Sequence, residues 1–541
     1  MQLIYNTMQQ ISFVNLLIQI ICCIIAKYLQ TDNSNQKHNI MEKHYLKLLM
    51  AIIILFFASN KGITQNFSNP SIEWQKCYGG SFADYGINII QTSDGGYISV
   101  GNTQSVDFDA VNNHSQYGDA FIVKLSMNFT TEWIKCLGGS TDDYASTVIQ
   151  TSDNGYILSG STDSNDGDVS GHHNSAPYLF SSDGWIVKLD SFGEIVWQKC
   201  YGGTGEDIFN KIIQTNDGGF ICAGYSNSND GDVVNPEMFI KGWVLKIDSL
   251  GSVEWSKCYG DSLENKFYDI IQTNDGGYML TGKKYYNDFN VPNIMLKINN
   301  NGNIYWQLEY GSSFEKIYSI KQLSDGTYIG VGQTVDSITT FFIGLVLKIS
   351  NEGEIEWIQN GDNYLGCYSS VQVVSDSCFV IGGYGKNDAN NSTDFLLLKM
   401  SNEGNIMWEQ YYGGIHTEKI YSFKQTTDQG FILTGITSSE WAGYYGDYDM
   451  WIVKLSAETG ISENDPIINF QIYPNPTQDI LTIQVDPTLL NIPYKIYSIT
   501  GQLVLSGNVT SETMILNLGS FSEGIYFLQI GNQTKKILKI K

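Results

Sequence analysis

The stretch WQKCYGGTGEDIFNKIIQT, residues 197–215, decides the fold, because a recognisable copy of it occurs seven times along the chain. Each copy begins with a tryptophan and ends at a turn such as NDGGF (216–220). Self-similarity at a period of 50 to 64 residues is typical of a repeat architecture. The tryptophans are Trp74, Trp133, Trp197, Trp255, Trp306, Trp357 and Trp408, and the turn aspartates are Asp94, Asp153, Asp217, Asp275, Asp325, Asp376 and Asp428.

Each repeat contains four short segments with the alternation and the β-branched residues of β-strands. In the second repeat they are YASTVIQ (144–150), GYILSG (155–160), GWIVKLD (184–190) and EIVWQKC (194–200). Four strands in each of seven units predict an all-β fold, a seven-bladed β-propeller over residues 65–455.

The two ends of the repeat array are complementary. The array opens with a lone tryptophan strand, IEWQKC (72–77), and it ends at DMWIVKLS (449–456) without a tryptophan strand. We therefore expect the first strand to complete the last blade, because this pairing would close the ring and remove an exposed sheet edge.

Charge and composition exclude several classes of function. The formal net charge is −25, so a nucleic-acid partner is not expected, because phosphate binding needs a basic face. All 31 basic residues are lysine, which removes bidentate arginine clamps. Four cysteines follow repeat tryptophans by three residues and are interpreted as small buried residues, with a disulfide framework as the alternative: Cys77, Cys136, Cys200 and Cys258.

The N-terminal 64 residues have the pattern of an export signal. Residues 41–64 begin with a second possible start methionine, Met41. They continue with the cations Lys43 and Lys47, a short apolar centre and small residues before the cleavage region. This predicts a signal peptide over 41–64. Residues 1–40 are interpreted as a mis-extended start, with an N-terminal anchor at 11–26 as the alternative.

The C-terminal part has a different composition. Residues 456–466 are polar and predict a linker, and residues 467–541 predict a small Ig-like β-sandwich. The order of YPNP (Tyr473, Pro474, Asn475 and Pro476), TGQLV (500–504), LGSFSEGIYFLQI (518–530, with Gly524, Ile525 and Tyr526) and a lysine-rich end resembles the type A sorting domain of the type IX secretion system. The resemblance implies a Gram-negative cargo protein that meets this secretion machinery and is released from the cell or attached to the outer-membrane surface.

Two charged series recur in the repeats. A lysine near the end of each third strand is expected to pair with a turn aspartate, since a catalytic lysine would be needed only once. A polar residue opens most first strands, and it is interpreted as a cap for the adjacent glycine turn, with cation binding as the alternative. These residues are Asp84, Asp143, Asp207, Asn265, Glu315 and Glu418.

The loops between second and third strands vary in length and lie on one face of the predicted ring, where binding usually occurs. Tyr444, Tyr445 and Trp441 crowd the seventh of these loops, and His172 and His173 lie in the second. We predict that these five residues belong to a contact surface for a neutral glycan, a polymer or a protein. The alternative is a polysaccharide hydrolase or lyase that uses loop carboxylates such as Asp107 and Asp109.

Two oxygen-rich loops, DSNDGD (163–168) and NSNDGD (227–232), resemble calcium loops without the EF-hand spacing. Solvated turns are the default interpretation, and Ca²⁺ is the only cofactor that the sequence indicates. Its candidate ligands are Asp163, Asp166, Asp168, Asp230 and Asp232.

Overall fold

The computed structural model describes residues 66–540 apart from fifteen short gaps. The gaps are 174–180, 236–238, 261–263, 286–291, 312–313, 337–338, 362–365, 376, 388–391, 441–443, 462–469, 486–492, 499–502, 512 and 531–532. The N-terminal segment with the predicted signal peptide, 41–64, therefore lies outside the described residues. The described chain is almost entirely β-structure, as predicted. The described residues divide into two compact units, residues 69–458 and a C-terminal unit that begins at Thr459 and also includes Asn66–Ser68.

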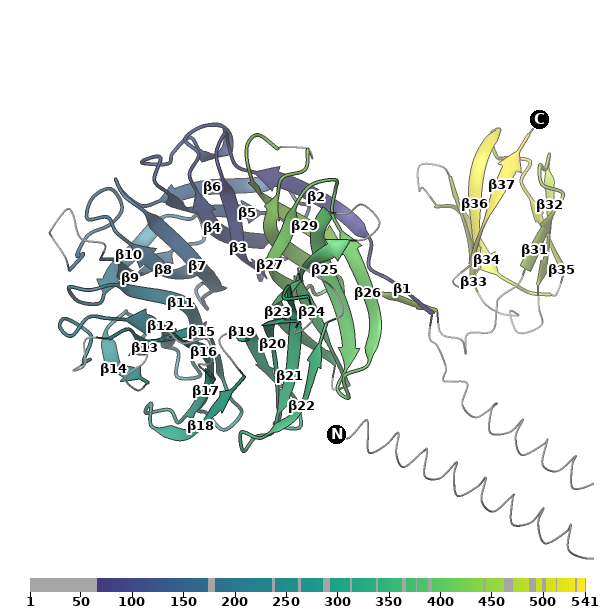
Figure 1. The fold of residues 1–541 in the computed structure, drawn as a ribbon. Helices are drawn as coiled ribbons and strands as arrows, with labels where there is room; N and C mark the ends of the chain where they lie inside the picture. Colours follow the sequence, from purple (N-terminus) through teal and green to yellow (C-terminus); the bar gives the residue numbers. More distant parts are fainter. Residues whose placement is uncertain are drawn as a thin grey trace, which may run out of the picture. The chain divides into compact units, whose positions relative to one another are not determined.

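The described residues of the first unit form seven four-stranded antiparallel sheets, which Figure 1 shows as blades of a propeller. The first strands of the blades are β3 (Asp84–Gln91), β7 (Asp143–Gln150), β11 (Asp207–Gln214), β15 (Glu264–Gln272), β19 (Lys316–Gln322), β23 (Cys367–Ser375) and β27 (Glu418–Gln425). The second strands are β4 (Tyr97–Thr103), β8 (Tyr156–Thr162), β12 (Phe220–Ser226), β16 (Tyr278–Tyr285), β20 (Tyr328–Val335), β24 (Cys378–Asn387) and β28 (Phe431–Thr437).

The third and fourth strands complete the sheets toward the outside. The third strands are β5 (Asp119–Leu125), β9 (Asp183–Leu189), β13 (Lys241–Ile247), β17 (Asn293–Ile298), β21 (Phe342–Ile349), β25 (Ser392–Ser401) and β29 (Asp449–Leu455). The fourth strands, which carry the repeat tryptophans, are β6 (Thr131–Leu137), β10 (Ile195–Tyr201), β14 (Val253–Tyr259), β18 (Ile304–Tyr310), β22 (Ile355–Asn360), β26 (Ile406–Tyr412) and β2 (Ile72–Tyr78).

Strand β2 closes the ring. It pairs with β29, so Trp74 lies opposite Lys454 and Tyr78 lies opposite Met450. The first strand of the repeat array thus supplies the fourth strand of the last blade, and this prediction is confirmed. Each first strand also contacts the first strand of the next blade, and the series returns from β27 to β3.

Every first strand contains a β-bulge at the same place. The pairing register between first and second strands shifts around one residue in all seven blades, and this residue is Ile87, Ser146, Asn210, Tyr268, Tyr318, Ser369 or Tyr421. A bulge sets two residues of one strand opposite a single residue of its partner. Two consecutive side chains of each first strand therefore turn toward the axis of the ring.

The repeat tryptophans dock each blade on the next one. In a β-turn of the following blade a glycine with positive φ leaves room for the indole, and a Cβ there would meet the ring at 3.1 Å for Gly193 on Trp133 and for Gly251 on Trp197. Trp74 instead stacks on Phe129, with 5.0 Å between ring centroids. The tryptophans therefore fill the contacts between blades.

The third-strand lysines and the turn aspartates form ion pairs on one face. The distances between Nζ and the carboxylate are 3.0 Å for Lys124–Asp94, 2.9 Å for Lys188–Asp153, 3.1 Å for Lys246–Asp217, 2.8 Å for Lys297–Asp275, 3.6 Å for Lys348–Asp325 and 2.9 Å for Lys454–Asp428. Lys399 pairs with Glu458 at 2.7 Å, and its own turn aspartate, Asp376, lies outside the described residues. The predicted pairing is confirmed in six blades, and the side chains of these lysines are buried or nearly so.

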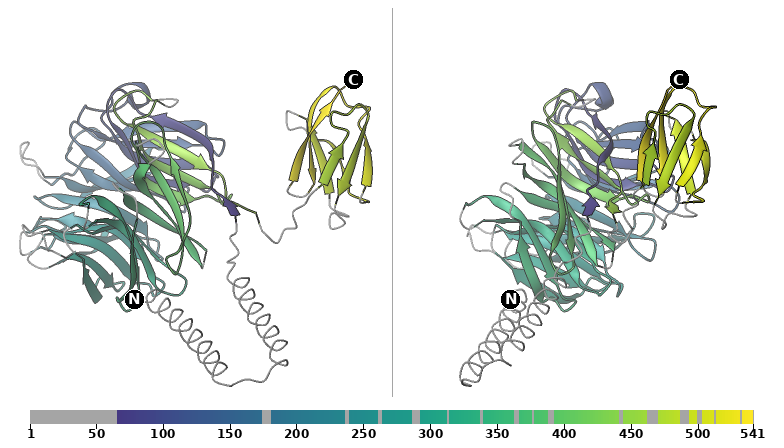
Figure 2. Two further views of the ribbon diagram at one scale, coloured as in Figure 1. Left: turned by 45° about the vertical axis from the view of Figure 1, so that its right-hand side comes forward. Right: turned by 90° about the vertical axis from the view of Figure 1, so that its right-hand side faces the viewer.

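The second unit is a small sandwich of two sheets, visible in yellow in Figure 2. One sheet contains β31 (Phe470–Tyr473), β32 (Ile480–Val485) and β35 (Thr513–Asn517). The other contains β33 (Pro493–Ser498), β34 (Leu503–Asn508), β36 (Gly524–Ile530) and β37 (Gln533–Lys539). Their inner faces share one core that includes Leu481, Ile483, Ile496 and Leu528.

A short two-stranded sheet includes part of the segment predicted as a linker. Strand β1 (Asn66–Ser68) pairs with β30 (Thr459–Ile461). The residues just before β30 belong to the propeller unit, because Ser456 bonds to Ser71 through its backbone amide at 2.9 Å and Glu458 pairs with Lys399.

Candidate functional site

The strand directions give the propeller two different faces. Tight turns, with their aspartates and lysines, occupy one face. The other face, here the variable-loop face, carries the second-to-third loops and the connections from each fourth strand to the next blade. The described candidate contact residues from the sequence, His172, His173, Tyr444 and Tyr445, map to the variable-loop face.

Carboxylates at the start of the first strands hold the glycine turns on this face. Asp84 Oδ2 accepts from the Gly80 amide at 2.7 Å, and Asp143 Oδ2 accepts from the Gly139 amide at 2.7 Å. The Gly203 amide donates to Asp207 and the Gly414 amide to Glu418, both at 2.8 Å. The capping interpretation of this series is thus confirmed for these four blades.

The same carboxylates have raised pKa values. Burial raises the pKa of Asp84 and Asp207 to about 6 and that of Asp143 to about 7, against the opposing effect of hydrogen bonds. Burial also raises the pKa of Asp449, on the neighbouring blade, to about 7, and the charge of Asp84 adds to this shift. The blade junctions on this face therefore hold carboxyl groups that titrate near neutrality.

The oxygen-rich loops strap neighbouring blades together. Asp166 Oδ1 accepts from the Ser140 amide at 2.8 Å, and Asp230 Oδ1 accepts from the Thr204 amide at 2.7 Å. The Asp168 amide donates to the Gly138 carbonyl at 2.8 Å, and the Asp232 amide to the Gly202 carbonyl at 2.7 Å. Asp107 makes the equivalent contact with the Ser81 amide in the first blade at 2.8 Å.

These contacts give the loop aspartates a structural task. The burial of Asp163 raises its pKa, and the backbone amide of this residue donates to the Asp142 carbonyl at 2.9 Å. Within the described residues, no group of three or more His, Cys, Asp and Glu side chains is arranged to hold a metal ion. Calcium binding by these loops stays a prediction.

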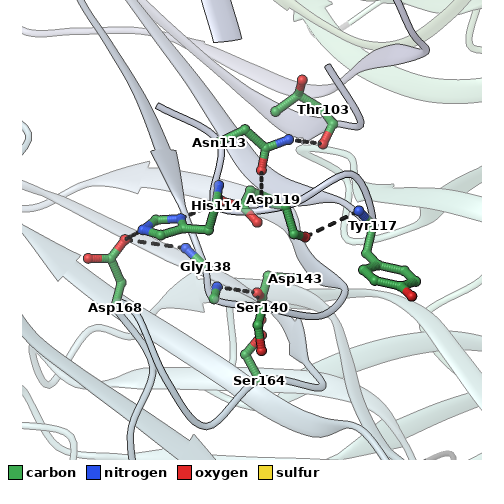
Figure 3. A network of polar contacts seen from close by, with 12 residues as sticks. Thr103, Asn113, His114, Tyr117, Asp119, Gly138, Ser140, Asp143, Ser164 and Asp168 are labelled. Carbon is green, nitrogen blue, oxygen red and sulfur yellow. Dashed lines mark hydrogen bonds and ion pairs between the residues drawn. The ribbon is translucent and has the colours of Figure 1, made fainter. Parts of the chain in front are cut away.

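Aspartates that open the third strands anchor the variable loops. Asp119 Oδ2 accepts from the backbone amide of His114 at 3.0 Å and lies 2.6 Å from its Nδ1. Figure 3 shows this contact beside the turn capped by Asp143. Asp183 Oδ2 accepts from the backbone amide of His173 at 2.9 Å and lies 2.6 Å from its Nδ1. In the last blade Asp449 Oδ2 accepts from the Tyr445 amide at 2.9 Å.

The electrostatics of His114 follow from this anchoring. Burial lowers the pKa of the imidazole, but the hydrogen bond to Asp119 and the nearby charges, including Asp168, outweigh it and raise the pKa. Asp168 Oδ2 lies 3.7 Å from Nε2, so the imidazole lies between two carboxylates. Sequence reasoning missed these third-strand aspartates. The signal was present, because each aspartate stands two positions before an aromatic residue in DAF (119–121), DGW (183–185) and DMW (449–451).

Tyr445 of the seventh loop forms an aromatic pair with Phe108 of the first loop. The rings of Tyr445 and Phe108 stack with 4.2 Å between centroids and 10° between planes. Phe108 begins the short 3₁₀ helix η1 (Phe108–Ala110) and has a positive φ of 49°. The two side chains are 55% and 45% exposed, for Phe108 and Tyr445 respectively. Phe82, on the adjoining turn, is exposed as well, and we call Phe82, Phe108 and Tyr445 the aromatic patch.

Exposed aromatic side chains concentrate on this face. Eleven exposed aromatic side chains are described in residues 69–458, and eight of them lie in or beside the loops of the variable-loop face. Tyr144 lies on a first strand, and Phe192 and Tyr305 lie in or near the tight turns. The eight are Phe82, Phe108, Tyr117, Phe239, Phe314, Phe341, Phe342 and Tyr445.

The other predicted contact residues have different environments. Trp441 lies outside the described residues. The hydroxyl of Tyr444 lies 3.4 Å from the Asp447 carbonyl. The side chain of His172 is buried, and its Nε2 lies 3.1 Å from the Ser181 carbonyl. His173 and Tyr445 occupy equivalent loop positions, one in the second blade and one in the last.

The C-terminal sandwich brings the predicted sorting residues onto neighbouring segments. Tyr473 ends β31, and the Asn475 Oδ1 atom accepts from the Leu538 amide of β37 at 2.8 Å. Gly524, Ile525 and Tyr526 open β36, which pairs with β37. In the described part of the chain, no helix has the length and apolar character needed to cross a membrane.

Fold and tail together define a propeller protein that carries an export tag. Residues 471–540 match the model of the secretion system C-terminal sorting domain. The chain therefore ends in a type IX secretion sorting domain, and the protein is secreted or displayed at the cell surface.

Similarity to individual known proteins is weaker. Over 97 residues the chain is 27% identical to beta-agarase A of Zobellia galactanivorans, a match that covers 16% of this chain and 18% of the agarase. PorZ, a surface component of the type IX secretion system of Porphyromonas gingivalis, is 11% identical, with a TM-score of 0.40 over 87% of this chain and 61% of PorZ. A Dyadobacter fermentans protein of unknown function is 8% identical, with a TM-score of 0.40 over 72% of this chain and 99% of that one.

Proposed function

We propose that this exported propeller is a binding protein that holds a neutral glycan on its variable-loop face, through the aromatic patch formed by Phe82, Phe108 and Tyr445. The observation that carries the proposal is the stacked, exposed pair Phe108–Tyr445. Exposed aromatic rings supply contact area at low entropic cost, and the apolar faces of sugar rings stack on them.

The charge of the protein supports a neutral ligand. The chain carries a net charge of −25, and carboxylates such as Asp107 and Asp447 lie in the loops beside the patch. Acidic polymers would be repelled from this face, whereas a neutral polymer meets no such barrier.

Binding is favoured over hydrolysis by the engagement of the loop carboxylates. Asp107 caps the Ser81 amide, and Asp166 and Asp168 contact the turn that contains Gly138 and Ser140. A glycosidase needs two carboxyl groups free to approach one sugar bond, about 5–10 Å apart. These side chains are instead held against backbone amides.

A glycan array probed with the purified protein tests the proposal. We expect neutral glycans to bind and acidic ones to give no signal. The double substitution Phe108→Ala with Tyr445→Ala should weaken binding at least about tenfold, because each stacked ring contributes on the order of 1 kcal/mol.

The matched control is Phe192→Ala, an aromatic residue that is 74% exposed in a tight turn of the opposite face. It should leave binding unchanged, and neither variant should lower the melting temperature by more than a few degrees, since all three side chains are exposed. Equal binding by the double variant and the unsubstituted protein would assign the ligand to another surface.

A further inference from the structure

A cavity of about 320 Å³ lies on the axis of the propeller. All seven first strands contribute to its wall, mostly through the bulged residue and the residue that follows it. This volume lies at the lower end of the range that holds small molecules in proteins. The seven bulges thus build a polar chamber from positions that regular strands would leave facing the blade cores.

The chamber is basic, although the protein as a whole is strongly acidic. Lys211 is part of its wall, and Lys321 and Lys424 act electrostatically on Lys211 or on Asp269, which also lines it. Lys321 and Lys424 follow the lining residues Ser319 and Ser422 by two positions on β19 and β27, so their side chains leave the same face of the strand. Together with Lys211 they face a wall whose one carboxylate among the lining residues is Asp269.

That carboxylate is already committed to the backbone of the ring. Asp269 Oδ2 accepts from the Ile320 amide at 2.9 Å, and its Oδ1 accepts from the Ile270 amide at 3.0 Å. Among the described lysines, Lys211 alone lies within ion-pair distance of Asp269, at 3.8 Å. One aspartate cannot balance several lysines, so the chamber keeps an excess of positive charge.

Lys321 and Lys424 carry this excess most clearly. Neither ammonium group forms a hydrogen bond or an ion pair with any of the described residues. Burial, together with the charges of Lys321 and Lys211, lowers the pKa of Lys424 to about 7, and burial also lowers the pKa of Lys321. Uncompensated charge in a desolvated place costs stability and is typical of functional sites.

Hydroxyl groups face the same space. Ser319 and Ser370 line the cavity on adjacent blades, and their hydroxyls have no hydrogen-bond partner among the described residues. By contrast, the hydroxyls of Ser146 and Ser369 donate to backbone carbonyls of the next blade, Phe209 at 2.9 Å and Ile420 at 2.8 Å. The wall thus combines groups that fasten the ring with groups that remain available to a ligand.

We propose that the central cavity binds a small hydroxylated anion, a sugar phosphate or a sugar acid, with its negative group at Lys321 and Lys424 and its hydroxyls at Ser319 and Ser370. This site is distinct from the aromatic patch on the loops. The anion would neutralise the two unpaired ammonium groups, which supplies both affinity and a reason for their placement.

Isothermal titration of the purified full chain at low salt and neutral pH tests the site with four probes. These are glucose 6-phosphate, glucuronate, inorganic phosphate and glucose. We expect at least one of the two sugar anions to bind at least tenfold more tightly than inorganic phosphate, and glucose not to bind. Tighter binding of glucose 6-phosphate would indicate a phosphate ligand, and tighter binding of glucuronate would indicate a carboxylate ligand.

Two variants that remove the same charge provide the comparison. Lys321→Met with Lys424→Met should weaken sugar-anion binding at least tenfold. Lys135→Met with Lys257→Met, on outer strands, should leave it unchanged. The aromatic variant Phe108→Ala with Tyr445→Ala should also bind the anion normally, which separates this site from the proposed glycan surface.

The absence of binding by both sugar anions would overturn the proposal, as would equal binding of glucose or an equal loss in the outer-strand variant. An NMR titration of the lysine ε-carbons in the unsubstituted protein needs no variant. The lysine that titrates near neutral pH should shift to higher pH when the tighter-binding sugar anion is added. An unchanged titration curve would contradict the site.

Discussion

At the residue scale, the third-strand lysines show how burial changes the value of an ion pair. Lys246 is 2% exposed and lies 3.1 Å from Asp217 and 2.9 Å from Glu254. Lys135 pairs with Glu194 at 2.7 Å, but its side chain is 28% exposed. The shorter pair is the more solvated one, so the distance between the charged atoms does not by itself show which pair contributes more to stability.

We expect Lys246→Ala to reduce the free energy of unfolding by about 2–3 kcal/mol, because it removes a buried stem as well as a charge. Lys135→Ala should cost less than about 1 kcal/mol, as solvated pairs do. Urea unfolding of both variants checks this. Equal losses would mean that packing of the lysine stem contributes nothing.

Sequence reasoning predicted these pairs but not their burial. The spacing of Lys188 and Asp153 within one repeat is visible in the sequence, since both flank turns that meet on one face. What covers the lysine depends on how the blades pack, which the spacing of one repeat does not reveal. For the same reason the anchoring of His173 by Asp183 was missed, since the two residues lie ten positions apart across a loop of irregular length.

At the element scale, β2 joins the two ends of the ring. It adds Tyr78 to the core between the last and the first blade, where this side chain is fully buried. The sequence predicted this pairing because one strand was missing at one end and in excess at the other. It did not predict the bulges, because an inserted residue leaves no mark in a strand whose inward positions accept tyrosine, serine and asparagine alike.

Removal of residues 65–78 should therefore lower the melting temperature of the propeller more than any single substitution considered above, and expose β29 to proteolysis. Differential scanning calorimetry and limited proteolysis measure both effects. Removal of residues 470–541 is the control, since that unit has a core of its own. A β2-deleted chain that melts like the intact one would show that the clasp contributes little.

At the scale of the whole molecule, the junction carboxyl groups make stability depend on pH. The folded pKa values of Asp84, Asp143, Asp207 and Asp449 are about 6 to 7, above the ordinary aspartate value of 3.8. Between these values the folded state binds more protons than the unfolded state, so stability falls as the pH rises. The turn carboxylates act in the opposite direction, because hydrogen bonds and lysines lower the pKa of Asp153 and Asp217 to about 2.

We expect the melting temperature to rise by several degrees between pH 7.5 and about pH 5, and to fall again below about pH 4 when the turn carboxylates become protonated. Thermal unfolding across this range measures the profile. The substitutions Asp143→Asn and Asp449→Asn should flatten the rise, since amides do not titrate. A melting temperature that increases steadily from pH 5 to pH 7.5 would contradict the assignment of these groups.

The cellular address and the ligand differ in how far the sequence could predict them. The sorting domain was recognisable because Tyr473 to Pro476 and Gly524 to Tyr526 are local motifs that do not depend on packing. The contact surface was only partly predictable. Tyr445 was identified from its loop, whereas its partner Phe108 is far away in the sequence and reaches it only because β2 closes the ring.

The most direct test of the account is hydrogen–deuterium exchange of the purified protein with and without the glycan that binds best on the array. Binding at the aromatic patch predicts slower exchange in residues 104–118 and 444–448, and no change in the tight turns around Asp153 and Asp217. Protection confined to the tight turns would contradict the assignment of the variable-loop face as the binding surface.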